Sequence, residues 1–557
     1  MERLAINELL KWKNKQYRKP LIIEGARQVG KTWLVKEFAR QNYRQLAYVN
    51  FEEMKILQNL FEQDFNIPRI LTAIGAATNV TCTEGETLIF LDEIQAAPHA
   101  VTSLKYFAEN APGYHVIAAG SLLGIELHQG ESFPVGKVEF LPLYPMNFSE
   151  FVMAMGEKNL AQLLQTKDWN MITMFAPKFQ ELLKYYYYVG GMPEAVLSFS
   201  QNRDWKEVRT IQKDILNSYQ RDMSKHAPSE IIPRITDLWK SLPAQLSKEN
   251  RKFIYGVVRE GARAREYELA LQWLLDAGLI YKVYNVKAPR LPLASYEDRA
   301  AFKIFVLDVG LLGAMSNLKA TTIVDGNSIF TEFKGALTEQ YVLQQLVLRY
   351  EPYYYAKTNS TQEIDFLLQD EEDEIVPLEV KAETNVKAKS LRQFVADNQS
   401  KKAYRISMND YLQEDWVTNV PLYAVNGLEF YSIQNESFLT KTQKKSLKNL
   451  HKREILLIFA LSLQELRGKD ENMKQENNRI QLPLEEIKLA FAASCVEGAA
   501  RKLGVPYIEI YERMRKVDLI NKFILPHYDT LHTESREYLI EDVIECLTNW
   551  EKKASHQ

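Results

Sequence analysis

The sequence predicts an α/β fold built on a parallel β-sheet with helices on both faces, followed by further domains. Two observations predict it. Short β-rich runs alternate with helical patterns from residue 20 to about residue 144, and this alternation is typical of a parallel sheet. At 557 residues the chain is also too long for one ordinary core, so we expect several domains.

The elements of the first domain follow from apolar periodicity. An amphipathic helix is expected over residues 1–15, where Leu4, Leu9 and Trp12 can share a face. The expected strands are residues 21–23, 46–50, 87–91 and 115–119, and the expected helices between them include residues 33–41 and 100–110. We expect this first domain to span residues 1–147.

Downstream of residue 147 the pattern becomes mostly helical. Residues 148–225 are expected to form a helical lid, interrupted at residues 190–193 by a Gly-Gly-Met-Pro turn. Residues 226–320 show helices followed by a strand hairpin, which is the order of a winged-helix module. The remaining expected segments are an α/β domain at 321–433, a lysine-rich linker at 434–453 and a compact all-α domain at 454–557.

The composition is that of an ordinary globular chain, with 46% hydrophobic and 25% charged residues. The 69 basic and 72 acidic side chains give a formal net charge of −3, so any contact with nucleic acid requires a local patch. The three cysteines lack the spacing of a disulfide framework or a zinc site. Neither a secretory signal nor a bilayer-spanning apolar run is legible. We therefore expect a cytoplasmic protein with no membrane-spanning segment.

Residues 25–32, hereafter the P-loop, match the pattern G-x-x-x-x-G-K-[ST] at every fixed position. They follow an apolar strand and open a helix, where backbone N–H groups and the helix N-terminus surround phosphate oxygens. Lys31 is expected to reach the β- and γ-phosphates of ATP, and the Thr32 hydroxyl to complete a Mg²⁺ shell. The alternative is a chance glycine-rich turn. The expected nucleotide-binding residues are Gly25, Ala26, Arg27, Gln28, Val29, Gly30, Lys31 and Thr32.

Two carboxylates at the end of an apolar strand support the phosphate site. Asp92 and Glu93 follow residues 87–91, at the edge of the sheet where ligands bind. Asp92 is expected to hold Mg²⁺, directly or through water, and Glu93 to polarise the attacking water. Ser121, at the tip of the next strand, is a candidate to sense the γ-phosphate or position water. A helix cap or turn residue is an equally good interpretation of Ser121.

Two cations are candidates to stabilise charge during the reaction. Arg27 would act within the same chain, and Lys137 would act from a neighbouring subunit. Each is also compatible with an ordinary solvated surface cation.

In combination, these motifs resemble a prokaryotic family of AAA-type ATPases. Its members join an AAA-type core and a winged helix to a C-terminal restriction-endonuclease-like domain. The resemblance implies an AAA-type fold, ATP with Mg²⁺, and a homo-oligomer as a possible assembly. AAA-type ATPases usually receive an arginine from a neighbouring subunit, whereas the matching region here offers Lys137. The resemblance covers about residues 1–425 and rests on residues 24–32, 91–95, 119–121, 140–145 and 190–194.

A second candidate site lies within residues 333–381. Glu339 is expected on a helix, Asp365 in a strand, and Glu379 and Lys381 two residues apart on the next strand, facing one side. This is the order of a PD-(D/E)xK nuclease core. Asp365 and Glu379 would hold Mg²⁺, and Lys381 would orient or deprotonate a water. The alternative is a set of charges that pair across a sheet in a scaffold without activity.

The remaining segments give weaker signals. Arg259, Arg263 and Arg265 flank the expected winged helix and could contact DNA, although packing against the ATPase is the favoured interpretation. The C-terminal region resembles a small bacterial helical domain of unknown function, which we expect to bind a protein partner or another subunit. There, His527, Asp529 and His532 fit a polar loop better than a metal site.

Three functions remain open from the sequence. The first is an AAA-type ATPase that couples ATP hydrolysis to conformational change, with the nuclease-like domain as its output. The second is an ATP-regulated, metal-dependent DNA nuclease, for example one acting in defence. The third is a nucleotide-held regulatory scaffold with little turnover, against which Glu93 argues because a pure binder needs no water-polarising carboxylate.

Overall fold

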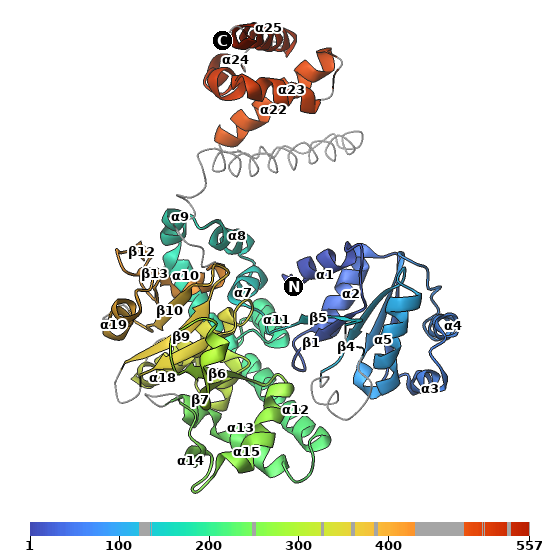
Figure 1. The fold of residues 1–557 in the computed structure, drawn as a ribbon, viewed down its shortest axis with the longest axis vertical. Helices are drawn as coiled ribbons and strands as arrows, with labels where there is room; N and C mark the ends of the chain where they lie inside the picture. Colours follow the sequence, from blue (N-terminus) through green and yellow to red (C-terminus); the bar gives the residue numbers. More distant parts are fainter. Residues whose placement is uncertain are drawn as a thin grey trace. The chain divides into compact units, whose positions relative to one another are not determined.

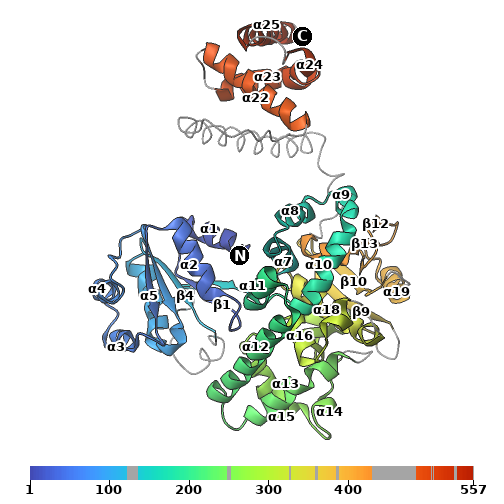
Figure 2. The same ribbon diagram turned by 180° about the vertical axis from the view of Figure 1, so that it is seen from behind.

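The computed structural model describes residues 1–121, 134, 136–247, 252–324, 328–357, 362–383, 388–428, 484–503, 505, 507–531 and 536–555. The chain divides into two compact units, residues 1–431 and 432–557, which we describe separately (Figures 1 and 2). The linker expected at residues 434–453 lies outside the described residues.

The first unit begins with a sheet of five parallel strands in the order β2-β3-β4-β1-β5. The parallel sheet that the alternating sequence pattern predicted is thereby confirmed. The edge strand β5 was not predicted, because it has only four residues and ends at Pro142, and proline argues against a strand unless the strand lies at an edge. The strands are β1 Leu21–Glu24, β2 Gln45–Asn50, β3 Thr87–Asp92, β4 His115–Ala119 and β5 Glu139–Pro142.

Helices cover both faces of this sheet (Figures 1 and 2). Since side chains alternate along a strand, Ile23 and Leu88 pack with α1 and α2, whereas Ile22 and Ile89 pack with α3, α4 and α5. Two separate apolar cores therefore fix the sheet from opposite sides. The helices are α1 Ala5–Lys13, α2 Lys31–Asn42, α3 Lys55–Gln63, α4 Ile67–Thr78 and α5 Pro98–Asn110.

A run of helices follows the first sheet, in the region expected to be helical. The turn between α10 and α11 requires glycine, since a Cβ on Gly191 would lie 2.0 Å from the carbonyl oxygen of Met146. The helices are α7 Phe148–Ala154, α8 Lys158–Thr166, α9 Trp169–Met174, α10 Ala176–Val189, α11 Pro193–Asn202 and α12 Trp205–His226.

A second sheet contains eight strands in the order β12-β13-β11-β10-β9-β8-β6-β7. The antiparallel hairpin β6–β7 lies in the segment expected to form a winged helix, yet it joins β8 through the pair Asn285–Tyr354. One sheet therefore crosses the boundary expected at residue 320. The strands are β6 Ile280–Val286, β7 Glu297–Val306, β8 Tyr353–Ala356, β9 Glu363–Gln369, β10 Ile375–Val380, β11 Tyr404–Ser407, β12 Leu412–Gln413 and β13 Thr418–Pro421.

Helices surround this second sheet (Figure 1). The helix on which Glu339 was expected is observed as the long helix α18. The helices are α13 Ile232–Leu246, α14 Tyr255–Val258, α15 Ala264–Asp276, α16 Val309–Met315, α17 Ala320–Val324, α18 Ser328–Leu346 and α19 Lys389–Asn398.

The second unit is a small helical bundle. Its core is formed by Cys495, Ala499, Ile510, Met514 and Val543 together with other apolar residues. A guanidinium–carboxylate pair, Arg513–Glu551 at 2.8 Å, links two of its helices. The helices are α22 Leu484–Leu503, α23 Tyr507–Lys516, the π-helical η4 Ile520–Ile524, α24 Tyr528–Leu531 and α25 Arg536–Ser555.

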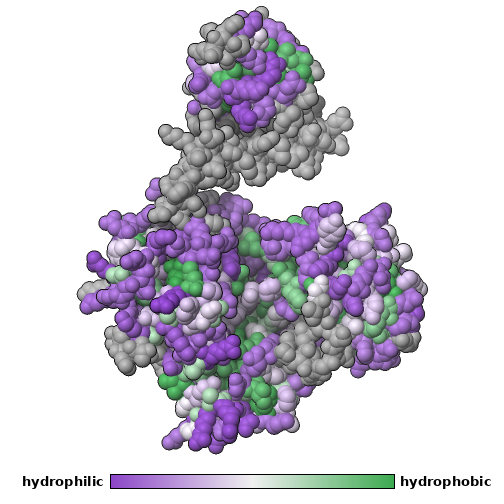
Figure 3. Space-filling model, in the orientation of Figure 1, coloured by the Kyte–Doolittle hydropathy of each residue, from purple (hydrophilic) through white to green (hydrophobic). Residues whose placement is uncertain are grey.

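Hydrophilic residues cover most of the face seen in Figure 3, with apolar residues in smaller patches. Among the helices that the structure describes, none combines the length and the apolar character needed to cross a bilayer.

Candidate functional site

The P-loop connects β1 to α2 and adopts a tightly curled backbone. Gly25, Gln28 and Gly30 have φ angles of 148°, 68° and 93°. A Cβ on Gly25 would lie 2.2 Å from the carbonyl oxygen of Leu143, so no side chain fits there. Gly30 is the N-cap of α2, and the helix N-terminus therefore faces the end of the loop.

Lys31 lies against the loop from which it projects. Its Nζ donates hydrogen bonds to the carbonyl oxygens of Gly25, at 2.8 Å, and Ala26, at 2.9 Å. The side chain is buried, and this burial lowers the pKa of Lys31 to about 8, although Glu93 and Asp92 act in the opposite direction. The ammonium group is thus held against the curled backbone of the loop.

Asp92 brings the P-loop and β3 into contact. Its Oδ2 accepts a hydrogen bond from the Thr32 hydroxyl at 2.8 Å and another from the Tyr48 hydroxyl at 3.1 Å. Burial raises the pKa of Asp92, and the Thr32 hydrogen bond opposes that effect. Tyr48, on β2, was missed by the sequence reasoning, since a tyrosine in a strand has no distinctive pattern.

Glu93 stands at a sharp bend directly after β3. Its backbone is left-handed, with φ 48° and ψ 46°, and it caps the 3₁₀ helix η1 Ile94–Ala96. Its Oε2 accepts hydrogen bonds from Gln95 Nε2 at 2.5 Å and from Ser121 Oγ at 3.4 Å. Ser121 reaches Glu93 because β4 lies between β1 and β3 in the sheet. The structure therefore brings five side chains to one edge of the first sheet, hereafter the P-loop edge: Lys31, Thr32, Asp92, Glu93 and Ser121.

At this edge the Thr32 hydroxyl and the Asp92 carboxylate lie side by side, 2.8 Å apart, as two protein oxygens that could hold a Mg²⁺ ion. Within the described residues, no group of three or more His, Cys, Asp or Glu side chains could hold a metal ion. Mg²⁺ usually binds through one or two protein oxygens and takes its other ligands from phosphate and water. The residues present fit Mg²⁺ that arrives with a nucleotide.

The two cations proposed for charge stabilisation are both in ion pairs within the chain. Arg27 Nη1 lies 2.5 Å from Oδ1 of Asp222 on α12, and Lys137 Nζ lies 2.8 Å from Oε1 of Glu109 on α5. Each side chain would have to leave its partner before it could reach a phosphate.

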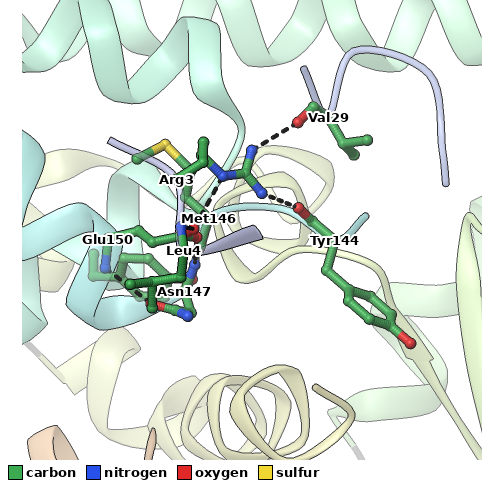
Figure 4. A network of polar contacts seen from close by, with 8 residues as sticks. Arg3, Leu4, Val29, Tyr144, Met146, Asn147 and Glu150 are labelled. Carbon is green, nitrogen blue, oxygen red and sulfur yellow. Dashed lines mark hydrogen bonds and ion pairs between the residues drawn. The ribbon is translucent and has the colours of Figure 1, made fainter. Parts of the chain in front are cut away.

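Arg3, which precedes α1, forms a hydrogen bond with the backbone of the P-loop (Figure 4). The sequence did not predict this role. Its guanidinium donates to the carbonyl oxygens of Val29, at 2.9 Å, and Tyr144, at 2.7 Å, and pairs with Glu150 Oε1 at 3.1 Å. All three partners lie far from Arg3 in the sequence, so only the tertiary fold joins them. The buried guanidinium links the loop to the end of the first sheet and to α7.

Later residues pack against the P-loop as well. A Cβ on Gly278, in the turn between α15 and β6, would lie 3.4 Å from the backbone nitrogen of Ala26. Tyr219, on α12, donates its hydroxyl proton to the carbonyl oxygen of Arg27 at 2.8 Å. The loop is therefore in contact with the segment that follows the first sheet.

The four residues of the second candidate site are divided between two groups. Lys381 Nζ lies 2.6 Å from Oε1 of Glu379, and Asp365 Oδ2 accepts a hydrogen bond from the neighbouring Val380 N–H at 2.7 Å. Burial raises the pKa of Glu379. Its Oε2 is buried and has no hydrogen-bond partner within the described residues.

Glu339 belongs to the other group. Its Oε1 lies 3.1 Å from Nζ of Lys303 on β7, which also lies 2.7 Å from Oε1 of Glu363. The side chains of Lys303 and Glu339 are each 1% exposed. The helix carboxylate expected to help hold a metal is thus paired with a lysine.

The three arginines considered for DNA contact lie in the segment before the β6–β7 hairpin. Arg259, Arg263 and Arg265 are all exposed.

A cavity of about 780 Å³ lies elsewhere, beside α4 and the end of α5. Its lining includes Phe65, Leu71, Cys82 and Tyr114 and none of the residues assigned to the P-loop edge. It supplies no curled backbone or acidic strand end, so its size does not make it the site of phosphate chemistry.

The histidines noted near the C-terminus belong to the second unit. His527 Nδ1 lies 2.9 Å from the carbonyl oxygen of Phe523, and His532 is outside the described residues.

Four families match parts of this chain. An AAA domain matches residues 17–152. Domains of unknown function match residues 180–322 (DUF8612) and 334–425 (DUF4143), and a protein of unknown function (DUF3791) matches residues 490–550. No curated protein matches the chain. The match to the AAA domain confirms the expected AAA-type P-loop ATPase fold of the first domain. The winged helix and the PD-(D/E)xK domain stay predictions.

Three solved structures are similar over part of the chain. The Walker-type ATPase paby2304 of Pyrococcus abyssi is 14% identical, with 57% of this chain and 95% of that chain covered and a TM-score of 0.38. The Orc1 protein of Aeropyrum pernix, solved with DNA, is 12% identical, with 56% and 91% covered and a TM-score of 0.24. Cdc6p from Pyrobaculum aerophilum is 11% identical, with 58% and 92% covered and a TM-score of 0.21.

Proposed function

We propose that this protein binds ATP with Mg²⁺ at the P-loop and hydrolyses it, and that hydrolysis changes the shape of the first unit. The hydrogen bond from Thr32 to Asp92, at 2.8 Å, carries the proposal. It places a hydroxyl from the loop and a carboxylate from β3 side by side, and P-loop NTPases hold a nucleotide-bound Mg²⁺ with oxygens of these two kinds.

Each residue at the edge then has a role. The backbone N–H groups of residues 25–32 surround the phosphates, and Lys31 exchanges its loop carbonyls for phosphate oxygens. Glu93 takes the proton of the attacking water, and Ser121 fixes the position of that carboxylate. When bound, Mg²⁺ supplies positive charge against the phosphate oxygens.

The contacts around the loop support a mechanical output. Arg27 and Ala26 touch α12 and the α15–β6 turn, so a loop that adjusts to a nucleotide moves its neighbours. The domain that contains β8 to β11 is the proposed output. A homo-oligomer, contact with DNA, and a protein partner for the second unit stay predictions, to be tested by mass measurement in solution with and without nucleotide.

The test uses purified full-length protein, a fluorescent ATP analogue and a phosphate-release assay. We expect Lys31→Ala to abolish binding, and Glu93→Gln to bind ATP and to release phosphate only at a small residual fraction of the wild-type rate. Arg40→Ala, an exposed change on the same helix α2, is the matched control and should behave as wild type. Folded protein that retains no nucleotide overturns the proposal, and so does normal phosphate release by Glu93→Gln. Binding without turnover in the wild type would favour the regulatory scaffold.

A second candidate function is a metal-dependent nuclease. The observation that favours it is the buried Glu379 Oε2, which has no hydrogen-bond partner among the described residues and lies in the group with Asp365 and Lys381. The pairing of Glu339 with Lys303 speaks against a fully assembled site. Plasmid and linear DNA should be incubated with Mg²⁺ or Mn²⁺, with and without ATP. Cleavage lost in Asp365→Ala supports the nuclease, and no cleavage under any condition rejects it.

A further inference from the structure

Gln95 holds the carboxylate of Glu93 through a bond that the sequence did not predict. Gln95 lies in η1, two residues after Glu93. The left-handed backbone of Glu93 turns the chain back, and the turn is closed by a hydrogen bond from Ala96 N–H to the Glu93 carbonyl oxygen at 2.9 Å. As a result, Gln95 Nε2 lies 2.5 Å from Oε2 of Glu93.

The two oxygens of Glu93 have different surroundings. Oε2 accepts from both Gln95 Nε2 and Ser121 Oγ. No described residue donates a hydrogen bond to Oε1. Because Oε2 is engaged from two sides, the carboxylate cannot rotate freely, and Oε1 is the oxygen left to accept a proton.

The Gln95 side-chain amide makes one hydrogen bond among the described residues, from Nε2 to Glu93 Oε2. Its carbonyl Oε1 is buried and has no hydrogen-bond partner within the described residues. A buried acceptor without a partner is unfavourable. The orientation of the amide is therefore determined by the bond from Nε2 to Glu93, and not by any contact of its oxygen.

We infer that Gln95 is a positioning residue for ATP hydrolysis, which together with Ser121 fixes Glu93 so that Oε1 faces the attacking water. The inference rests on the proposed function. In the step concerned, the water oxygen bonds to the γ-phosphorus, and the bond from that phosphorus to the ADP oxygen breaks. The proton released by the water passes to Oε1 of Glu93.

Gln95→Met tests the inference, because methionine has a similar length and no N–H donor. We expect kcat to fall about tenfold, while KM and the Kd for fluorescent ADP change by less than about twofold. The matched control is Gln58→Met. Gln58 donates a comparable hydrogen bond to the carbonyl oxygen of Phe51 at 2.7 Å, outside the P-loop edge, and its loss should leave kcat unchanged. An unchanged kcat in Gln95→Met overturns the inference.

A double variant separates positioning from general support of the fold. In the Glu93→Gln background no proton acceptor remains to be positioned, so adding Gln95→Met should change the residual single-turnover rate by less than about twofold. A further fall of about tenfold would show that Gln95 acts independently of Glu93 and would overturn the inference. The unfolding midpoint of each variant, compared with wild type, shows that the folded protein was measured.

Failure of the proposed function gives a different result. If wild-type protein binds ATP and releases no phosphate, hydrolysis itself is rejected, and the inference falls with it. If wild type turns over, Glu93→Gln keeps only a small residual rate and Gln95→Met matches wild type, the proposed function stands and the inference about Gln95 alone is overturned.

Discussion

Arg27 Nη1 lies 2.5 Å from Oδ1 of Asp222, although 195 residues separate the two in the sequence. Arg27 belongs to the P-loop and Asp222 to α12. One turn earlier on the same helix, Tyr219 donates to the carbonyl oxygen of Arg27. Two side chains of helix α12 therefore contact the loop, one through an ion pair with Arg27 and one through a hydrogen bond to the loop backbone. This helix is well placed to respond when the loop binds a phosphate.

Asp222→Asn should strengthen ATP binding. The change removes a negative charge next to the phosphate site and frees Arg27 from its pair, whose side chains are 37% and 11% exposed. Because such a pair is partly solvated, we expect the Kd for ATP to fall by only about fivefold, and less at high salt. Fluorescence titration measures the effect. Asp214→Asn, an exposed change on the same helix, is the control, and an equal shift in both variants would contradict the role of the pair.

Arg3→Met should destabilise the first unit. The guanidinium is buried and makes three polar contacts, so its loss leaves the buried Glu150 without a cation. Glu150 keeps hydrogen bonds from the Leu4 and Asn147 N–H groups, and we therefore expect a loss of about 3 kcal/mol, at the lower end for a broken buried pair.

The thermal unfolding midpoint at a fixed scan rate checks this expectation. Arg40→Met, whose side chain is 71% exposed, should leave the midpoint unchanged. Adding Glu150→Gln to Arg3→Met should recover part of the loss, since it removes the unpaired charge. No recovery would mean that the lost packing of Arg3, and not the exposed charge of Glu150, causes the destabilisation.

The parallel sheet and the P-loop edge were predictable because their signals are local. Leu21 to Thr32 contain a complete strand, loop and helix start, and Asp92 and Glu93 end an apolar run. The edge strand β5 gives a weaker local signal, since it has only four residues and ends at Pro142. Its place in the sheet depends on pairing with β1.

The partners of Arg3, Arg27 and Gln95 could not be predicted, because these contacts depend on the tertiary fold. Arg3 lies 147 residues from Glu150, and Arg27 lies 195 residues from Asp222, separations that no local pattern encodes. Gln95 lies within the recognised motif, but only the left-handed bend at Glu93 turns its side chain back. Glu339 was grouped with Asp365 by chain order, whereas the structure gives it Lys303 from the neighbouring hairpin as a partner.

Lys303→Met should destabilise the same unit through the second sheet. Lys303 joins β7 to Glu339 on α18 and to Glu363 on β9, and its Nζ lies 4.9 Å from the centre of the Tyr354 ring. Loss of the ammonium leaves Glu339 buried and without that cation. Because Glu363 is 27% exposed and stays partly hydrated, we expect a loss of about 3 kcal/mol.

The midpoint of thermal unfolding again measures the change. Lys401→Met removes an exposed lysine that pairs with Glu374, and it should have no measurable effect. Combining Lys303→Met with Glu339→Gln should restore part of the stability, because the remaining group is neutral. An unchanged midpoint in Lys303→Met would show that this cluster does not stabilise the second sheet.

Nucleotide binding should weaken above pH 8. Burial lowers the pKa of Lys31 from 10.5 to about 8 in the nucleotide-free protein, and phosphate oxygens require the charged ammonium. The folded protein thus binds fewer protons than the unfolded chain between about pH 8 and pH 10.5, so this group makes stability rise with pH in that window. The same loss of charge opposes phosphate binding, and the Kd for ADP should increase about tenfold per pH unit above 8. Titrations of the Kd for ADP from about pH 7 to pH 9.5 at constant ionic strength measure this increase.

Lys31→Arg is the control for this pH dependence. Its side chain stays charged throughout the range, so its Kd for ADP should not follow the trend. An equal rise of the Kd in both proteins would assign the pH dependence to another group.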